Sequence, residues 1–142
     1  MMTFKGWLAI REGFWLNDGK AGPDGAFWVG SMDDRPAKEP VAALYRIAPD
    51  GTAERKVDGL LVSNGLAWSA DGRWLATGGF RRVVVRDAAT LEVRRELTTG
   101  LAGRVTAVRF SPDSARLAVA DGVPGRSGVV RIVDLSGDGP PT

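Results

Sequence analysis

A short turn motif recurs along this chain, and it constrains the fold more than any other feature. Trp68-Ser69-Ala70-Asp71 is matched by Phe110-Ser111-Pro112-Asp113, with Asp113 following Asp71 by 113 − 71 = 42 residues. A third copy at Pro23-Asp24-Gly25 precedes Asp71 by 71 − 24 = 47 residues. Units that repeat every ~40–50 residues and contain four short strands are typical of β-propeller blades.

Between these turns, short apolar and β-branched runs are separated by glycine and proline, as is typical of strands. The chain has 19 glycines and 8 prolines. The expected strands are 19–22, 26–31, 43–48 and 52–58 in a first blade, 65–69, 74–78, 82–87 and 92–97 in a second, and 105–111, 116–120 and 129–135 in a third. The third blade therefore has one predicted strand fewer than the others.

Three blades cannot cover their own end faces, because each blade normally packs between two neighbours. The N-terminal segment Thr3–Ile10 is rich in apolar residues and predicts the strand that the third blade lacks. We therefore predict an all-β fold: a β-propeller fragment of about three four-stranded blades, completed to a six-bladed ring by homodimerisation with N-terminal strand exchange. A homotrimer with nine blades is the alternative.

The amino-acid composition limits which side chains could take part in catalysis and which kinds of partner we expect. The chain has no cysteine and no histidine, so catalysis would have to use carboxylates, amides, hydroxyls, Lys, Arg or Tyr45. The 19 basic and 17 acidic residues nearly balance, and we expect no nucleic-acid partner. No apolar run approaches ~20 residues, and the start lacks the pattern of a secretory signal. We therefore expect no membrane association and a cytoplasmic location.

The first ~75 residues carry a set of motifs in a specific order and spacing. The motifs are Asn17-Asp18-Gly19-Lys20, Pro23-Asp24-Gly25-Ala26-Phe27-Trp28-Val29-Gly30-Ser31-Met32, Ala43-Leu44-Tyr45-Arg46 with Pro49-Asp50-Gly51, and Ser63-Asn64-Gly65-Leu66-Ala67-Trp68-Ser69. This half of the chain resembles the SMP-30/gluconolactonase/regucalcin family. The resemblance implies a six-bladed propeller and a calcium- or zinc-dependent lactonase activity.

The resemblance also implies a site at the ring axis, where the family holds its metal with one Glu, two Asn and one Asp. Asn17 and Asn64 match the two metal-binding asparagines, and Asp18 matches an acid that contacts substrate. Ca²⁺ or another divalent cation is thus the candidate cofactor. The family's Glu has no counterpart, the stretch 100–104 has no acid where the Asp is expected, and Trp15 replaces a basic residue.

From Asp71 onward the chain resembles WD40 repeats instead. The usual Trp-Asp pair is replaced by Arg86-Asp87 and Val133-Asp134, and the Gly-His pair is absent, so the hydrogen-bond network of such blades cannot form. We divide one structural unit into a closing strand (1–12), an SMP-30-like part (13–70) and WD40-like blades (71–142). The join at Trp68–Gly72 suggests an engineered fusion of propeller fragments, with natural recombination as the alternative.

Three functions compete at this point, and no catalytic residue is assigned. The first is a self-assembling half-propeller scaffold without catalytic activity, the second a residual metal-dependent lactone hydrolase, and the third a peptide- or protein-binding module of WD40 type. Asn-Asp-Gly and Asn-Gly are also common turn formers. The acid pair Asp33-Asp34 is expected in a solvated loop.

Overall fold

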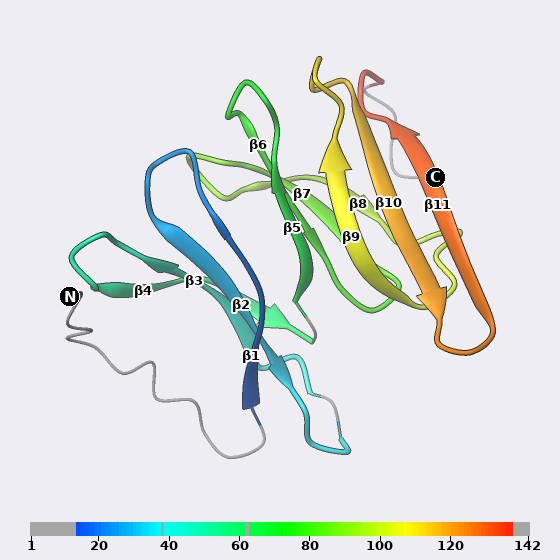
Figure 1. Ribbon diagram of the computed structural model, residues 1–142, viewed down its shortest axis with the longest axis horizontal. Coiled ribbons are helices and arrows are strands. Elements are labelled where there is room, and N and C mark those ends of the chain that lie inside the picture. Colours follow the sequence, from blue (N-terminus) through cyan, green and yellow to red (C-terminus); the bar gives the residue numbers. More distant parts are fainter. Residues whose placement is uncertain (1–13, 38, 62, 138–142) are drawn as a thin grey trace. The chain divides into compact units, whose positions relative to one another are not determined.

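The computed structural model describes residues 14–37, 39–61 and 63–137, and these ranges contain eleven β-strands and no helix (Figure 1). The strands form three antiparallel sheets in the orders β1-β2-β3-β4, β5-β6-β7-β8 and β11-β10-β9. Their bounds are β1 Phe14–Ala21, β2 Phe27–Asp33, β3 Ala42–Ile47, β4 Ala53–Leu60, β5 Asn64–Trp68, β6 Trp74–Gly78, β7 Val83–Asp87, β8 Val93–Leu97, β9 Arg104–Phe110, β10 Arg116–Val123 and β11 Ser127–Asp134. The first sheet belongs to one compact unit, ending at Ser63, and the other two to a second.

The prediction of an all-β fold is confirmed, and each of the eleven expected strands is present. Two strands, β1 and β10, are longer than expected by more than one residue. β1 begins at Phe14, because its first half also pairs with β2, and β10 continues to Val123 as one arm of a long hairpin with β11. The predicted closing strand, Thr3–Ile10, lies outside the described residues.

The repeated turn motif forms the same local structure in the two copies that contain a serine, at Ser69 and Ser111. The hydroxyl of Ser69 donates to the carboxylate of Asp71, and that of Ser111 donates to Asp113. Each hydroxyl also accepts a hydrogen bond from the backbone N–H five positions later, at 2.9 Å in both. These serine hydrogen bonds are the main reason why the pKa of each aspartate is lowered. The sequence repeat is therefore a structural repeat.

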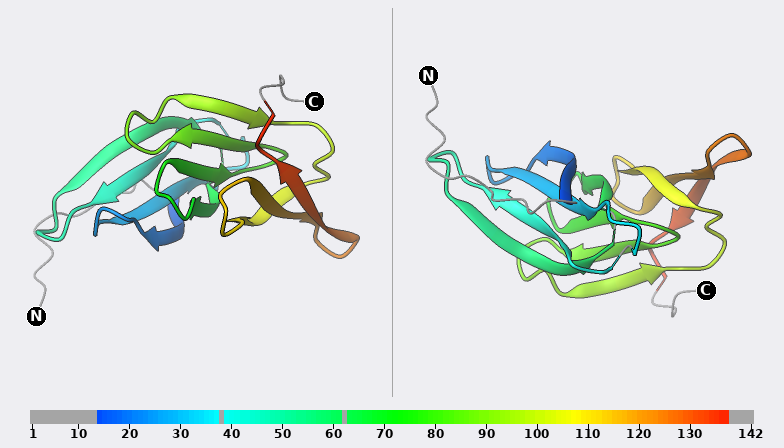
Figure 2. Two further views of the ribbon diagram at one scale, coloured as in Figure 1. Left: turned by 90° about the horizontal axis from the view of Figure 1, so that it is seen from above. Right: turned by 90° about the horizontal axis from the view of Figure 1, so that it is seen from below.

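The core of the second unit lies where the sheet β5–β8 packs against the sheet β9–β11 (Figure 2). Alternate residues of β7 and of β10 point into it, as the two-residue period of a strand requires. Val83, Val105, Leu117 and Val119 have no exposed surface. These aliphatic side chains hold the first strands of the two sheets, β5 and β9, side by side.

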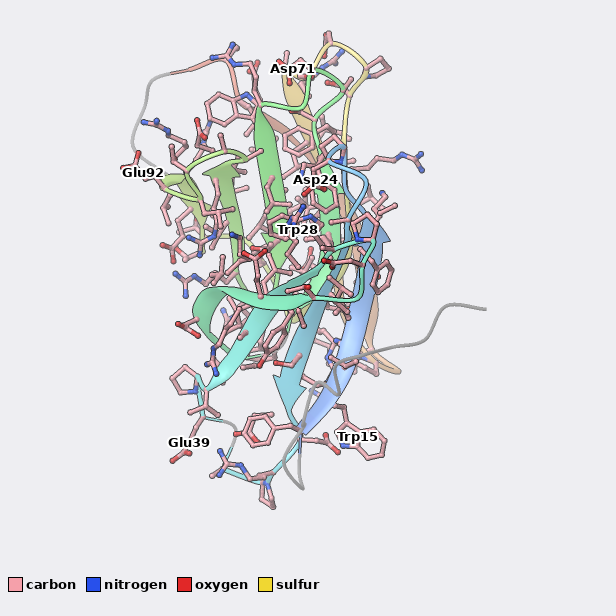
Figure 3. The ribbon with its side chains drawn as sticks, turned by 90° about the vertical axis from the view of Figure 1, so that its left-hand side faces the viewer. Trp15, Asp24, Trp28, Glu39, Asp71 and Glu92 are labelled. Carbon is pink, nitrogen blue, oxygen red and sulfur yellow. The ribbon has the colours of Figure 1, made fainter. Side chains whose placement is uncertain are left out.

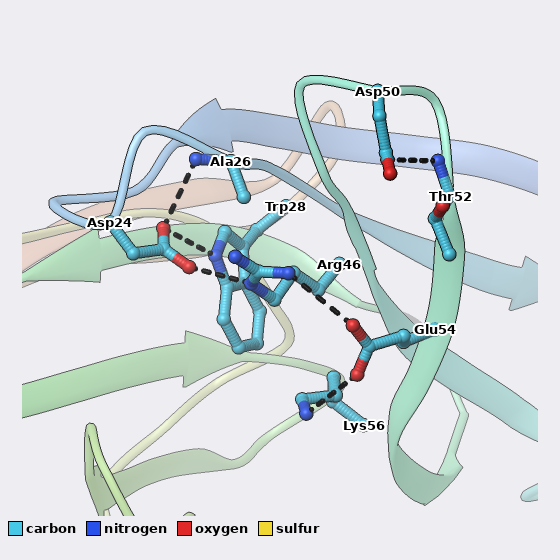
Figure 4. Close-up of polar contacts among 8 residues, drawn as sticks. All are labelled: Asp24, Ala26, Trp28, Arg46, Asp50, Thr52, Glu54 and Lys56. Carbon is cyan, nitrogen blue, oxygen red and sulfur yellow. Dashed lines mark hydrogen bonds and ion pairs between the residues drawn. The ribbon is translucent and has the colours of Figure 1, made fainter.

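In the first unit, the carboxylate of the turn residue Asp24 links β2 to β3, because it binds a buried tryptophan of β2 and an arginine of β3 (Figure 4). Asp24 accepts hydrogen bonds from the Trp28 indole N–H at 3.2 Å and from Arg46 Nε at 2.6 Å. A Cβ added at Gly22 would lie 2.6 Å from the Asp24 carboxylate, so only glycine leaves room for this contact. This network lies in the first sheet, outside the residues that were compared with WD40 repeats.

Candidate functional site

Asn17 and Asp18 lie at a β-bulge in β1. The register with β2 shifts between Leu16 and Gly19, so that Asn17 and Asp18 together stand opposite the single residue Gly30. A bulge turns side chains away from the regular alternation of a strand, and bulges are frequent beside functional sites. Both side chains are half-buried. The bulge therefore sets the direction of the two residues that the resemblance assigns to metal and substrate.

The carboxamide of Asn17 has a fixed orientation. Its Nδ2 donates to the backbone carbonyl of Ser63 at 2.8 Å. Ser63 comes this close because Gly30 has no side chain: an added Cβ would lie 2.0 Å from the Ser63 hydroxyl oxygen. Since the nitrogen is engaged, Oδ1 is the end of the amide that can accept a hydrogen bond or bind a cation. Amide oxygens are ordinary ligands of hard divalent cations.

Asn64 occupies the corresponding position in the next sheet. It opens β5 opposite Gly78, and the register shifts between Asn64 and Leu66, at Gly65. A Cβ at Gly78 would lie 2.2 Å from the Asn64 carbonyl oxygen, and Gly65 has a φ of 73°, which favours glycine. The only two asparagines of the chain thus stand at bulges opposite glycines of the second strand, each within its own unit.

The first strand of the third sheet has a bulge as well, but no acid lies there. The register of β9 shifts at Thr106. The buried acid of this sheet is Asp121 on β10, which accepts hydrogen bonds from the Ala102 N–H at 2.6 Å and from Arg131 Nε at 3.3 Å. Asp121 thereby holds the loop before β9. Sequence reasoning missed it, although an acid among apolar strand residues was a usable signal.

The prediction of a solvated loop is wrong for Asp33, while Asp34 is exposed as expected. Asp33 ends β2 with no exposed surface. It accepts hydrogen bonds from Arg35 Nε at 2.8 Å, Arg35 Nη2 at 3.0 Å and the Glu39 N–H at 2.8 Å. The Arg35 hydrogen bonds hold the pKa of Asp33 well below its usual range. Its oxygens organise the loop, so we do not count it among metal ligands.

The donors at the predicted positions are two neutral amides and one carboxylate. Within residues 14–37, 39–61 and 63–137, no three His, Cys, Asp or Glu residues gather as a metal-binding group. Trp15 stands where the family often carries a basic residue; it is 61% exposed and lies near the beginning of β1 (Figure 3). Since Ca²⁺ takes about six to eight oxygens, one chain does not fit a complete metal site.

Three antiparallel sheets, two of them four-stranded and each with a bulged first strand, define a protein of β-propeller type. A family model described as SMP-30/Gluconolactonase/LRE-like region matches residues 10–123. The chain therefore belongs to this family. The match crosses the predicted join at Trp68–Gly72 and includes most of the residues that we compared with WD40 repeats, and the comparisons show neither a WD40 half nor a fusion.

Curated relatives match a short part of the chain. Regucalcin of Danio rerio is 48% identical over 60 residues, which are 41% of this chain and 20% of that protein. Regucalcin of Homo sapiens is 37% identical over 60 residues, 39% of this chain and 20% of its own length. The chain thus spans about a fifth of the curated relatives that it matches.

Solved structures match over most of the chain. A luciferin-regenerating enzyme has 27% identity and a TM-score of 0.67, covering 87% of this chain and 43% of that one. The calcium-binding protein regucalcin of Agrobacterium tumefaciens has 23% identity and a TM-score of 0.66, covering 86% and 42%. A putative gluconolactonase has 21% identity and a TM-score of 0.64, covering 88% and 45%. The last two show the fold alone.

None of the residues that the structure describes forms a helix with the length and apolarity that a membrane span requires.

Proposed function

We propose that this chain is a half-ring subunit of a divalent-metal-dependent lactone hydrolase of the SMP-30/gluconolactonase type. Two copies would complete a six-bladed ring, with the N-terminal strand of each added to the other. Family membership supports the activity, and solved relatives are described as a calcium-binding protein and a putative gluconolactonase. The observation that carries the proposal is the Asn17 carboxamide, which is held at a bulge with its nitrogen bound to Ser63.

In this proposal Asn17 and Asn64 supply amide oxygens to the cation, and Asp18 contacts the substrate. A bound cation of this kind polarises the lactone carbonyl and lowers the pKa of a coordinated water. One chain offers too few oxygens for such a site, so we derive no reaction step from it alone. The missing donors would come from the second copy.

The test is hydrolysis of a small sugar lactone, monitored by proton release with added Ca²⁺, Zn²⁺ or Mn²⁺ and with a chelator. We expect turnover that needs a cation and that rises per chain as concentration drives association. The matched variants are Asn17→Leu, which removes the oxygen, and Asn17→Asp, which keeps an oxygen but loses the donor to Ser63. Turnover should be lost in the first and retained in part in the second. No turnover by the associated protein with any of the three cations would refute the hydrolase.

Assembly without catalysis is the second candidate function. It is favoured by the described loop 100–103 before β9, which has no carboxylate where the family's last acid is expected, and by the engagement of Asp121 with Ala102 and Arg131. Association in the absence of lactone turnover would support it. The engineered origin and the WD40-type interaction module stay hypotheses drawn from the sequence.

A further inference from the structure

The third strand of the last sheet, β11, is far more exposed than the third strands of the other sheets. β3 begins with three buried apolar residues, and so does β7. β11 is also rich in apolar residues, yet Val130 is 69% exposed and Ile132 is 63% exposed. Within residues 14–37, 39–61 and 63–137, two equivalent strands are thus covered and the third is not.

β11 is also an edge strand in the part of the chain that the structure describes. Each of its eight residues is paired with β10, and the sheet order ends with β11. In the other sheets the same edge is covered by β4 and β8. An exposed edge presents a row of backbone N–H and C=O groups that can pair with another strand.

The exposed residues of β11 share one face of the sheet with small alanines of β10 and β9 and with the exposed Arg109 of β9. Ile132 is paired with Ala118 and Val130 with Ala120, and Ala120 is in turn paired with Ala107 of β9. Residues that stand opposite each other in neighbouring strands project from the same face of a sheet. On β10 the small alanines Ala118 and Ala120 separate Arg109 from the two large β11 side chains, which stand at the open edge of the sheet.

We propose that β11 accepts a fourth strand from a second copy of this chain, formed by Thr3–Ile10. This inference rests on the two-copy ring proposed above. The segment lies among residues 1–13, outside the described residues, and it has the eight-residue length of β11. Its Thr, Phe, Trp and Ile residues favour strand structure. Its single charged residue, Lys5, is complementary to the exposed Asp134 at the end of β11.

The charges select one antiparallel register, and antiparallel is the direction of every described strand pair of this sheet. With Lys5 opposite Asp134, Trp7 stands opposite Ile132, and Ala9 stands opposite Val130. The aromatic ring of Trp7 would then cover the exposed side chains of Val130 and Ile132. Cross-strand pairs of this kind, opposite charges and aromatic with β-branched residues, are stabilising.

A second copy is favoured over the same chain by the short connection to β1. Only residues 11–13 separate Ile10 from Phe14, and the four Cα–Cα steps between them span at most ~14 Å. A strand at Thr3–Ile10 therefore stays close to the start of its own β1. Closure within one chain would require β1 and β11 to be neighbours, whereas a second copy imposes no such condition.

The chain lacks cysteine, so introduced cysteines report strand pairing cleanly. Ala9→Cys and Val130→Cys chains are mixed and oxidised, and linked peptides are identified by mass spectrometry. Directly opposed residues lie ~4.5–5.5 Å apart between Cα atoms, which a disulfide can bridge. We expect a two-chain product in which the disulfide joins position 9 of one chain to position 130 of the other. The control pairs Ala9→Cys with Ser127→Cys, which lies three residues from Val130 and on the other face, and it should give no such product.

The proposal is overturned if the mixed chains, with their β-sheet circular dichroism intact, give no disulfide between positions 9 and 130. It is equally overturned if a chain with both substitutions closes a disulfide within itself at high dilution. Lactone hydrolysis is measured on the same linked protein. A disulfide link without lactone turnover supports the pairing of Thr3–Ile10 with β11 and refutes the hydrolase. Lactone turnover without the disulfide link refutes this strand pairing alone.

Discussion

At the scale of single residues, Asp33 shows how a charged side chain can be structural. Its carboxylate lies without exposed surface at the end of β2, bound by the Arg35 guanidinium and by two backbone N–H groups. The guanidinium also lies 5.0 Å from the centroid of the Phe14 ring, over β1. One ion pair thereby joins the loop after β2 to the first strand.

This arrangement predicts a specific pH dependence of stability. Because folding lowers the Asp33 pKa, the ionised carboxylate stabilises the native state above its unfolded pKa of about 3.9. This contribution is lost as the pH falls from that value toward the lower folded pKa. Replacing Asp33 by Asn should therefore flatten the fall in unfolding free energy below about pH 4.

The measurement is urea unfolding at a series of pH values. Arg35→Met removes the partner and leaves the carboxyl, and it should flatten the same part of the profile. If the unfolding free energy of both variants falls toward acid pH as steeply as that of the parent, the ion pair makes no contribution to acid stability.

Asn17 was predicted from the sequence as a site residue, but its geometry was not. The motif Asn-Asp-Gly favours a turn as much as a ligand, and nothing in it indicates that Ser63 would accept the amide hydrogen bond. That contact joins residues 46 positions apart. Local sequence indicates the residue type, and only tertiary pairing determines the orientation.

At the scale of elements, each sheet has a bulge in its first strand, opposite or beside a glycine in the first two sheets. The strands themselves were predicted well, because glycine and proline turns delimit short apolar runs. The bulges could not be predicted, since a bulge is a mismatch between two strands and appears only when their register is known. The same holds for the burial of Asp33, whereas Asp121 could have been recognised as an acid among apolar strand residues.

The bulge in β1 predicts an unequal response of two glycines to alanine. In Gly30→Ala the new Cβ would lie 2.0 Å from the Ser63 hydroxyl oxygen. We expect Ser63 to be displaced and the unfolding free energy to fall by about 1–3 kcal/mol. In the matched variant Gly128→Ala the Cβ meets no atom within 4 Å, and we expect a change within about 0.5 kcal/mol.

Urea unfolding monitored by circular dichroism compares these two variants with the parent. Equal stability of Gly30→Ala and the parent would mean that Ser63 does not sit against Gly30. The hydrogen bond that orients Asn17 would then lose its structural basis.

At the scale of the whole molecule, the chain corresponds to only part of its solved relatives. It matches its family over residues 10–123 yet covers less than half the length of solved relatives. Its sheets expose large apolar side chains such as Trp15, Phe27, Val130 and Ile132. In the ring that we propose, a second copy covers such surfaces and supplies the oxygens that one chain lacks.

The central claim, that two copies complete the ring, is tested most directly by absolute mass in solution. Multi-angle light scattering on the eluting peak should give twice the 15.1 kDa of one chain. A folded protein with the mass of a single chain at all concentrations would contradict the account, since β11 and the apolar faces would then be stable in water without a partner.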